Sequence, residues 1–494
     1  MASLVKAWPI GASVLLLLAA FPPFNLGFLV FVGLVPWLQS LKNASGKGAV
    51  RSGFVFGFLF MLGQLYWLQP LTSKWTGSVG LSLVPLFIGP LVVAPFFALG
   101  AWLIHACQKR NWDLLIPVVW SGIEVLRSYC PGLAFPWGQL ATPLYPYPAM
   151  IQLAWMGGIT LVSAWVVMGN LAVAKLMSGD GFLASRPAIF GFLLLAVAGS
   201  MRYNASPPGT LTTFTVGQLG LDLAFGDRDE NWRRTGEIVQ RFQDAALVQG
   251  SKLLVLPEGL VRGQADLPPP VPFGVRREIP ILFGGQRGDK RRFQSAYAFD
   301  GDWKAVDKTR LVVFGEYVPG REFLPFLESF NLPQGDLHAG KEVKAMQVGD
   351  LTVGPLLCFE ALFPDVARKQ AANGAQLLAV MALDDWYFGT AAPEQLMAAS
   401  VFRAVETGLP VVRAAPLGYS IAVKANGEIV ARARLRETIP MRVEIPVPSE
   451  PNQFSGAGVY EWLAPLICLA VVGNAVWERR KNGPPKSANG DKTN

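Results

Sequence analysis

Histidine, cysteine and charge are all scarce in this sequence of 494 residues. The histidines and cysteines are only six: His105, His338, Cys107, Cys130, Cys358 and Cys468. They form no group with the spacing of a zinc site, so we expect neither a metal ion nor another cofactor. A Ser-His-Asp mechanism would depend on His338, because His105 lies in an apolar run. Any hydrolytic or transfer chemistry in this chain therefore needs a base other than histidine.

Charged residues make up only 16% of the chain, and hydrophobic residues make up 51%. Soluble domains usually contain about a quarter charged residues. The composition therefore excludes a purely soluble protein, a disordered chain and a fibrous repeat. The formal net charge of +8 would suit a nucleic-acid partner, but that depends on where the charges lie.

Apolar windows fill the first part of the chain and recur near its end, and several reach the length of a membrane span, about 20 residues. They cover residues 7–41, 52–73, 75–108, 114–129, 128–174, 187–201 and 460–477. An FPPFN break at 21–25 divides the first window into two spans. We therefore predict a membrane protein with about eight transmembrane helices: seven spans in residues 1–205 and an eighth in 456–480, with a polar tail in 481–494.

The lysines and arginines between these windows indicate the orientation. With the N-terminus in the cytoplasm, the inner loops contain Lys42, Lys47, Arg51, Lys109, Arg110, Lys175 and Arg186. The outer loops before residue 206 then contain only Lys74. The positive-inside rule places both termini in the cytoplasm and residues 206–455 outside. The excess of lysine and arginine thus reflects the orientation of the chain in the membrane, and we expect no nucleic-acid partner.

Residues 206–455 have frequent charges and turn signals, and strand-like runs alternate with helical ones. Apolar runs predict strands at 212–219, 252–256, 279–284, 294–299, 351–357, 376–381 and 409–414. Helical spacing predicts helices at 229–249, 363–373 and 393–407, and an Asn-Gly turn predicts a hairpin of 420–424 with 428–431. This alternation predicts an α/β domain with helices over largely buried strands.

Three residues that follow strand-like runs form a candidate active site: Glu258, Lys308 and Cys358. Cys358 is the only cysteine of residues 206–455, so it is either an inert buried residue or a nucleophile. A carboxylate in a partly apolar pocket can take the thiol proton. A nearby lysine stabilises a thiolate and then an oxyanion, and the backbone N–H of Phe359 is a possible second oxyanion donor.

Several motifs resemble the membrane-bound branch of the nitrilase superfamily. Residues 306–319, VDKTRLVVFGEYVP, are similar to its lysine motif, and residues 357–360, LCFE, to its cysteine elbow. Residues 403–408, RAVETG, resemble its helix after the cysteine strand, and FPWGQ at 135–139 resembles a loop before its sixth span. Seven spans, a nitrilase-like domain and a last span are the layout of the apolipoprotein N-acyltransferase family.

This resemblance implies an αββα sandwich in residues 206–455 and a two-step acyl transfer. Cys358 would take an acyl chain from a phospholipid and pass it to the diacylglyceryl-cysteine amine of a lipoprotein. Glu258 would be the general base and acid, and Lys308 would stabilise the oxyanion. The supporting residues would be Glu316, Phe359, Glu360 and Trp386. We expect a monomer in the bacterial cytoplasmic (inner) membrane, with its catalytic domain on the periplasmic side.

The sequence departs from the family pattern around the expected pocket. LPE at 256–258 replaces Trp-Pro-Glu, and QLG at 218–220, QL at 395–396 and PLG at 416–418 also differ. The stretch around Trp386 reads LDDWY. These changes leave open a membrane-anchored amidase, an acyltransferase with another acceptor, or an inactive lipid-binding paralogue.

Two further features allow two interpretations each. Glu124 and Arg127 lie three residues apart in an apolar helix, which favours a structural ion pair over a site. Residues 321–341 contain prolines, glycines and phenylalanines. They predict either a packed surface helix with a turn or a mobile lid that admits lipid.

Overall fold

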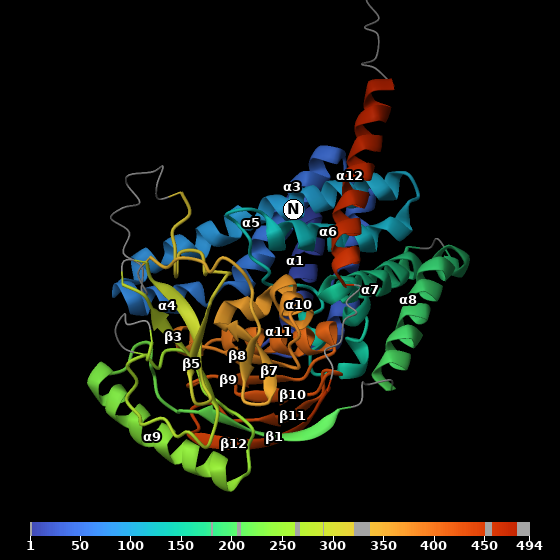
Figure 1. The fold of residues 1–494 in the computed structure, drawn as a ribbon. Coiled ribbons are helices and arrows are strands. Elements are labelled where there is room, and N and C mark those ends of the chain that lie inside the picture. The colour runs from blue at the N-terminus through green and yellow to red at the C-terminus, as the bar shows by residue number, and fades with distance from the viewer. Residues whose placement is uncertain are drawn as a thin grey trace, which may run out of the picture.

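The computed structural model shows a bundle of apolar helices packed on an α/β domain (Figure 1). It describes residues 2–178, 181–204, 209–261, 267–289, 291–320, 336–449 and 457–481. Most of the predicted lid, residues 321–335, and nearly all of the polar tail lie outside the described residues.

Apolar helical segments occupy every predicted window. They are α1 (Ala2–Ala20), α2 (Val35–Lys42), α3 (Gly46–Gln64), α4 (Leu68–Thr76), α5 (Val79–Lys109), α6 (Ile116–Tyr129), α7 (Ala154–Met177), α8 (Gly181–Asn204) and α12 (Ala457–Lys481). Within the described residues, four of them are long and apolar enough to cross a membrane, and α3 with α4, bent by 56°, would be a fifth. A helix of 14 residues such as α6 rises only about 21 Å. The prediction of eight full spans is therefore not established, although the chain has the helices of a membrane protein.

Glycine and aromatic residues pack these helices against one another. A Cβ atom added at Gly57 of α3 would come within 2.5 Å of Phe97 on α5, so only glycine permits this close approach. Trp37 stacks on Phe56 with ring centroids 4.4 Å apart, and Trp120 meets the same cluster edge-on.

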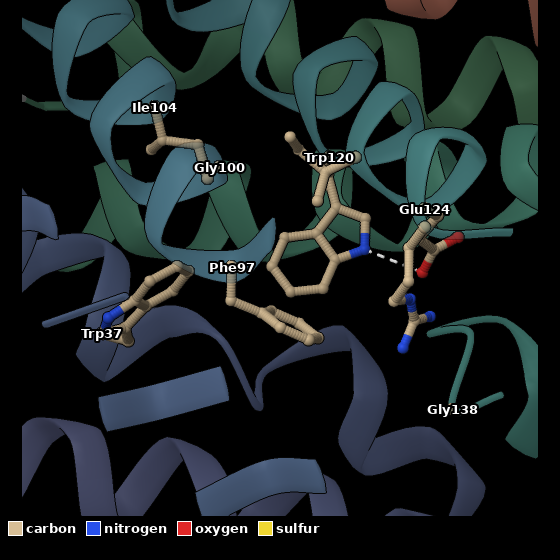
Figure 2. Close-up of a pocket in the computed structure, with 9 residues that line it drawn as sticks. Trp37, Phe97, Gly100, Ile104, Trp120, Glu124 and Gly138 are labelled. Carbon is tan, nitrogen blue, oxygen red and sulfur yellow. Dashed lines mark hydrogen bonds between the residues drawn. The ribbon is translucent and has the colours of Figure 1, made fainter. Parts of the chain in front are cut away.

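The predicted ion pair between Glu124 and Arg127 does not form, although both side chains line one pocket between the helices (Figure 2). Glu124 Oε1 accepts hydrogen bonds from Trp120 Nε1 and Leu140 N, each 2.9 Å long. The Arg127 guanidinium lies over the Phe97 ring instead. Glu124 and Arg127 therefore each contact other residues instead of pairing with one another.

Within its described residues, the α/β domain contains two sheets of six strands each. The first has the order β12 (Ile439–Val447), β1 (Thr210–Gln218), β2 (Leu254–Val255), β3 (Ile281–Arg287), β4 (Phe293–Phe299) and β5 (Trp303–Asp307). The second has the order β11 (Ile429–Arg432), β10 (Ile421–Val423), β9 (Val411–Ala414), β8 (Leu377–Met381), β7 (Leu351–Leu357) and β6 (Met346–Val348). The central strands β1–β2–β3 and β7–β8–β9 are parallel, and the outer pairs are antiparallel.

The two sheets pack face to face, with helices on both outer faces. Phe214, Val255 and Leu282 of the first sheet share one core with Val353 and Met381 of the second. Helix α9 (Arg228–Val248) covers the first sheet on the side away from the membrane helices (Figure 1). Helices α10 (Pro364–Ala372) and α11 (Ala392–Thr407) cover the second sheet, and their buried side chains share a cluster with the membrane helices. This is the αββα sandwich that the resemblance implied.

The predicted strands and helices of the domain are confirmed to within a few residues, but β5, β6 and β12 were missed. Strand β12 has the alternating burial of a strand with one face inward. Pro440 and Pro446 make the segment look unlike a strand in the sequence, because proline is uncommon in strands. They are tolerated here because β12 lies at the edge of its sheet.

Candidate active site

Each of the three candidate residues follows the end of a strand. Glu258 follows β2, and Lys308 follows β5 in the same sheet, whereas Cys358 follows β7 in the other sheet. The charges of Glu258 and Lys308 both act on the Cys358 thiol, and those of Glu258 and Cys358 act on Lys308. The predicted residues therefore meet at one edge of the sandwich, between its two sheets.

Cys358 stands at a sharp turn. Its φ of +49° lies in the left-handed region, which a residue with a Cβ adopts at a cost of about 1–3 kcal/mol. The chain passes there from β7 directly into a 3₁₀ turn, Cys358–Leu362. We call this turn the elbow.

Glu360 joins the elbow to the loop of Lys308. Its Oε2 accepts from Leu357 N at 3.0 Å, and its Oε1 accepts from Thr309 N at 2.7 Å and from Thr309 Oγ1 at 2.9 Å. The carboxylate therefore fixes the backbone on both sides of the site. It contacts the residues after Lys308 and not the Lys308 side chain itself.

Glu316 holds the Lys308 ammonium. Lys308 Nζ lies 2.7 Å from Glu316 Oε1, and both side chains are almost completely buried. Glu316 Oε2 accepts from Val312 N at 2.8 Å, so the carboxylate is itself fixed. Desolvation alone would lower the pKa of Lys308, but the charges of Glu316, Glu258 and Cys358 raise it above its ordinary value. The lysine is therefore a permanent cation beside the thiol.

Glu258 has the environment of a general base. Only 1% of it is exposed, and its Oε2 has no hydrogen-bond partner among the residues that the structure describes. Desolvation raises the pKa of its carboxyl to about 8, against the opposing charge of Lys308 and with support from Glu316 and Glu360. Glycine at 284 gives the carboxylate its room, because a Cβ there would lie 3.0 Å from Glu258 Cα.

The resting nucleophile is a thiol and not a thiolate. Desolvation, followed by the charge of Glu258, raises the pKa of Cys358 to about 12, although Lys308 acts in the opposite direction. As a nucleophile, Cys358 would therefore need a base that removes its proton during attack. The chemistry of Glu258, whose pKa is about 8, fits a group that takes such a proton and returns it.

Aromatic side chains from both parts of the chain surround the elbow. Phe359 lies 6.0 Å from Phe135 between ring centroids, and Tyr387 meets Trp67 edge-on at 4.9 Å. Trp386 packs against Phe225 at 5.1 Å. The indole N–H groups of Trp67, Trp137 and Trp386 are buried without hydrogen-bond partners among the described residues. Phe135 and Trp67, which lie in connections between the apolar helices, thus contact the elbow and Tyr387.

Sequence reasoning missed the polar groups behind the elbow. Arg413 and Asp384 form a buried bidentate pair with both distances 2.8 Å, and Asp385 accepts from Leu223 N and Leu417 N. The sequence feature that could have indicated these groups is the presence of charged residues inside or just after fully apolar strands. Among the described residues, no group of three or more His, Cys, Asp or Glu side chains could hold a metal ion.

Comparisons with known proteins cover both parts of the chain. Residues 13–172 match the family model of the apolipoprotein N-acyltransferase N-terminal domain, and residues 284–445 match that of carbon-nitrogen hydrolase. Lys308 and Cys358 lie inside the second match, and Glu258 lies before it. The solved structure of Saccharomyces cerevisiae Nit3, a member of branch 10 of the nitrilase superfamily, is 19% identical, with a TM-score of 0.36 over 48% of this chain and 91% of that chain.

Curated relatives match along nearly the whole length. The apolipoprotein N-acyltransferase of Geobacter metallireducens is 28% identical, over 94% of each chain. That of Gloeobacter violaceus is 29% identical over 85% of this chain and 84% of its own, and that of Haemophilus influenzae is 26% identical over 84% of each. Together with the two family models, these relatives show that the chain belongs to the apolipoprotein N-acyltransferase family.

Proposed function

We propose that this protein transfers a fatty acyl chain from a phospholipid, through a thioester on Cys358, to the N-terminal amine of diacylglyceryl-cysteine lipoproteins. The observation that supports this most is the set of opposed groups at the elbow. A neutral thiol at a strained turn is acted on by the charge of a fixed ammonium and by that of a carboxyl whose Oε2 has no hydrogen-bond partner among the described residues. Both substrates are lipids, and apolar helices form one wall of this site.

In the first half-reaction, Glu258 takes the Cys358 proton as Sγ attacks the ester carbonyl carbon. A carbon–sulfur bond forms, and the carbonyl oxygen becomes an oxyanion that Lys308 Nζ and the N–H of Phe359 stabilise. Collapse of this intermediate breaks the carbon–oxygen bond to glycerol. Glu258 returns its proton to the leaving oxygen, so the products are a lysophospholipid and the acyl thioester.

In the second half-reaction, the lipoprotein amine attacks the thioester carbon. Glu258 accepts a proton from the amine, and Lys308 again stabilises the oxyanion. The carbon–nitrogen bond forms and the carbon–sulfur bond breaks. Cys358 recovers its proton, and no cofactor is consumed.

We further propose that residues 1–205 and 456–480 lie in the bacterial inner membrane, that 206–455 form the periplasmic catalytic domain, and that 481–494 are a cytoplasmic tail. Contacts at the two ends of the helices support this topology. Lys74, the predicted outer lysine, donates to the carbonyl of Phe388 in the catalytic domain at 3.5 Å. Arg110, predicted to be inside, pairs with Glu478 at the far end of α12. One chain supplies every proposed catalytic residue, so a monomer suffices.

Intact-mass spectrometry of the purified protein after incubation with phospholipid tests the acyl donor step. We expect a mass gain of one acyl chain, removed by hydroxylamine and absent in Cys358→Ser. A wild-type protein that gains no mass and releases no lysophospholipid would contradict the proposal.

A diacylated lipopeptide then tests the acceptor. Loss of the thioester with equal gain of an amide-linked acyl chain on the lipopeptide is the expected result. Release of free fatty acid with an unmodified lipopeptide would instead indicate a hydrolase, the alternative that the altered residues around the pocket left open.

A further inference from the structure

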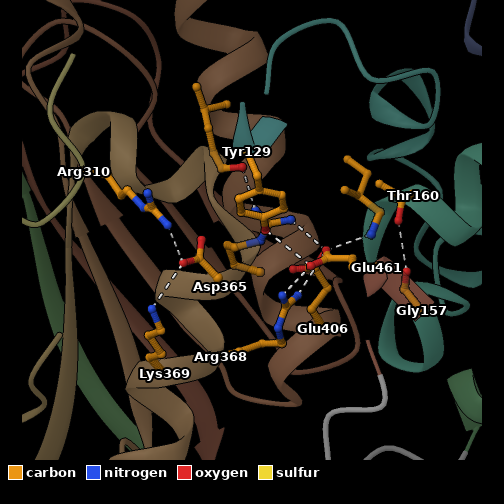
Figure 3. A network of polar contacts seen from close by, with 12 residues as sticks. Tyr129, Gly157, Thr160, Arg310, Asp365, Arg368, Lys369, Glu406 and Glu461 are labelled. Carbon is orange, nitrogen blue, oxygen red and sulfur yellow. Dashed lines mark hydrogen bonds and ion pairs between the residues drawn. The ribbon is translucent and has the colours of Figure 1, made fainter. Parts of the chain in front are cut away.

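The RAVETG segment of α11 forms a polar connection between the elbow and the membrane helices (Figure 3). Arg403 and Glu406 pair through Arg403 Nη2 and Glu406 Oε1 at 2.7 Å, and their side chains are 1% and 0% exposed. Neither residue has a part in the acyl-transfer steps. Burying such a pair is costly, and hydrophobic residues often stabilise a fold as well. The position of the pair therefore calls for an explanation other than stability.

One end of the connection holds the elbow. Arg403 Nη1 donates to the carbonyl oxygens of Ala361 and Leu362, both at 3.1 Å. These carbonyls belong to the 3₁₀ turn that begins at Cys358. The guanidinium therefore fixes the far end of the turn on which the nucleophile stands.

The other end of the connection holds a break in a membrane helix. Helix α7 is interrupted at Gly157 and Gly158, and Gly158 has φ +69° and ψ 179°. Glu406 Oε1 accepts from the N–H of Ile159, the first residue after the break, at 2.8 Å. A carboxylate at the start of a helix satisfies a free N–H and favours the helix dipole. Glu406 thus caps the second half of α7 from the catalytic domain.

A second ion pair holds the same junction. Arg368 of α10, the helix that follows the elbow, contacts Glu461 of α12 at 2.5 and 3.2 Å. Tyr129 of α6 also donates to Glu461, at 3.3 Å. A Cβ at Gly158 would come within 3.0 Å of Glu461 Oε1, so the break in α7 leaves room for both carboxylates.

We propose that Glu406 and Arg403 are positioning residues that set the place of Cys358 relative to the membrane helices. The inference rests on the proposed function, because it concerns a substrate held in a bilayer. The membrane fixes the depth of a phospholipid ester, so the sulfur of Cys358 must lie at the same depth relative to the bilayer. A displacement of about 1 Å can cost about a hundredfold in rate. A small soluble reagent reaches the thiol without that constraint.

The test compares two reactions of Cys358 in the full-length protein in phosphatidylglycerol nanodiscs. One is acylation by the lipid, measured by intact mass, and the other is alkylation by iodoacetamide, measured on the Cys358 peptide. For Glu406→Ala, we expect acylation to fall about tenfold or more while alkylation changes by less than about twofold. Glu406→Gln, which keeps an acceptor for Ile159 N but loses the charge, should show a smaller fall and serves if the alanine variant does not accumulate.

Glu478→Ala is the matched control, because it removes the Arg110 ion pair from α12 far from the elbow. Both reactions should keep their wild-type rates in this variant. A parallel fall of both reactions in the Glu406 variants, or no fall in either, would overturn the positioning role. Failure of the wild-type protein to acylate would instead contradict the proposed function, so the two failures are distinguishable.

Discussion

In the proposed mechanism, Glu258, Lys308 and Cys358 divide the chemistry between a fixed charge and a mobile proton. Lys308 keeps its positive charge because Glu316 lies 2.7 Å away in a buried site. Burial raises the pKa of both Glu258 and Cys358, so each group can hold the proton that the proposed steps transfer between them. The negative charge of the oxyanion would therefore develop beside the Lys308 ammonium, which is already in place.

The pKa of Glu258 predicts a pH profile for acylation. The base is the carboxylate, and its pKa of about 8 means that it is mostly protonated at lower pH. The rate of Cys358 acylation should therefore rise about tenfold per pH unit from about pH 6 and level off above about pH 8. Intact-mass time courses across that range measure it. A rate that is flat from about pH 6 upward would show that Glu258 has an ordinary pKa and is not the base described here.

Removal of Glu316 tests the fixed charge. Glu316→Ala leaves the buried Lys308 ammonium without its closest counter-ion, which should lower the free energy of unfolding by about 3 kcal/mol. We expect acylation to fall about a hundredfold or more, because the ammonium is no longer held for the oxyanion. Glu444→Ala, which removes an exposed pair with Arg442, is the control for both measurements. Near wild-type acylation in Glu316→Ala would refute the role of this carboxylate.

At the scale of elements, close contact between β3 and the start of the Glu258 loop sets the position of the base. Gly284 N donates to Pro257 O, and Gly259 N donates to Gly284 O. A methyl group at residue 284 would press on Glu258 and on Leu357 of β7, each 3.0 Å away. The glycine therefore controls the distance between the base and the cysteine strand.

Gly284→Ala should accordingly damage catalysis more than stability. We expect a loss of about 1–3 kcal/mol in the free energy of unfolding from overpacking and a fall of about tenfold or more in acylation from the displaced carboxylate. Gly274→Ala is the matched control, because its Cβ would meet only one side-chain atom at 4.0 Å. Equal acylation by the two variants would mean that the site tolerates this displacement.

The sequence predicted the residues of the site better than their connections. Glu258 and Cys358 could be found because each follows a strand with a local apolar signature. Lys308 follows β5, which was missed, so only the resemblance of its motif indicated it. The contacts of Arg403 and Glu406 could not, because their partners are backbone groups of the elbow and of α7. The Glu124–Arg127 pair failed for a related reason: helical spacing permits the pair, but Trp120 and Leu140 compete for the carboxylate. Contacts that depend on tertiary structure have no local pattern.

At the scale of the whole molecule, the αββα sandwich presents one of its helical faces to the membrane helices. Helices α10 and α11 bury their side chains against the bundle, whereas α9 lies on the far side (Figure 1). The elbow thus packs with the apolar helices, whereas α9 is distant from them. This arrangement requires the catalytic domain to stand on one defined side of the bilayer.

Accessibility of single cysteines to a membrane-impermeant maleimide tests that side. Lys47 and Lys74 are both exposed, and the charge distribution places them on opposite faces of the membrane. In a chain whose four natural cysteines are replaced by alanine, Lys74→Cys should be labelled in intact spheroplasts. Lys47→Cys should be labelled only after lysis, so each variant is the control for the other. Labelling of Lys47→Cys alone in intact spheroplasts would reverse the topology. The catalytic domain that contacts Lys74 would then lie in the cytoplasm, away from the exported lipoproteins that the proposed reaction requires.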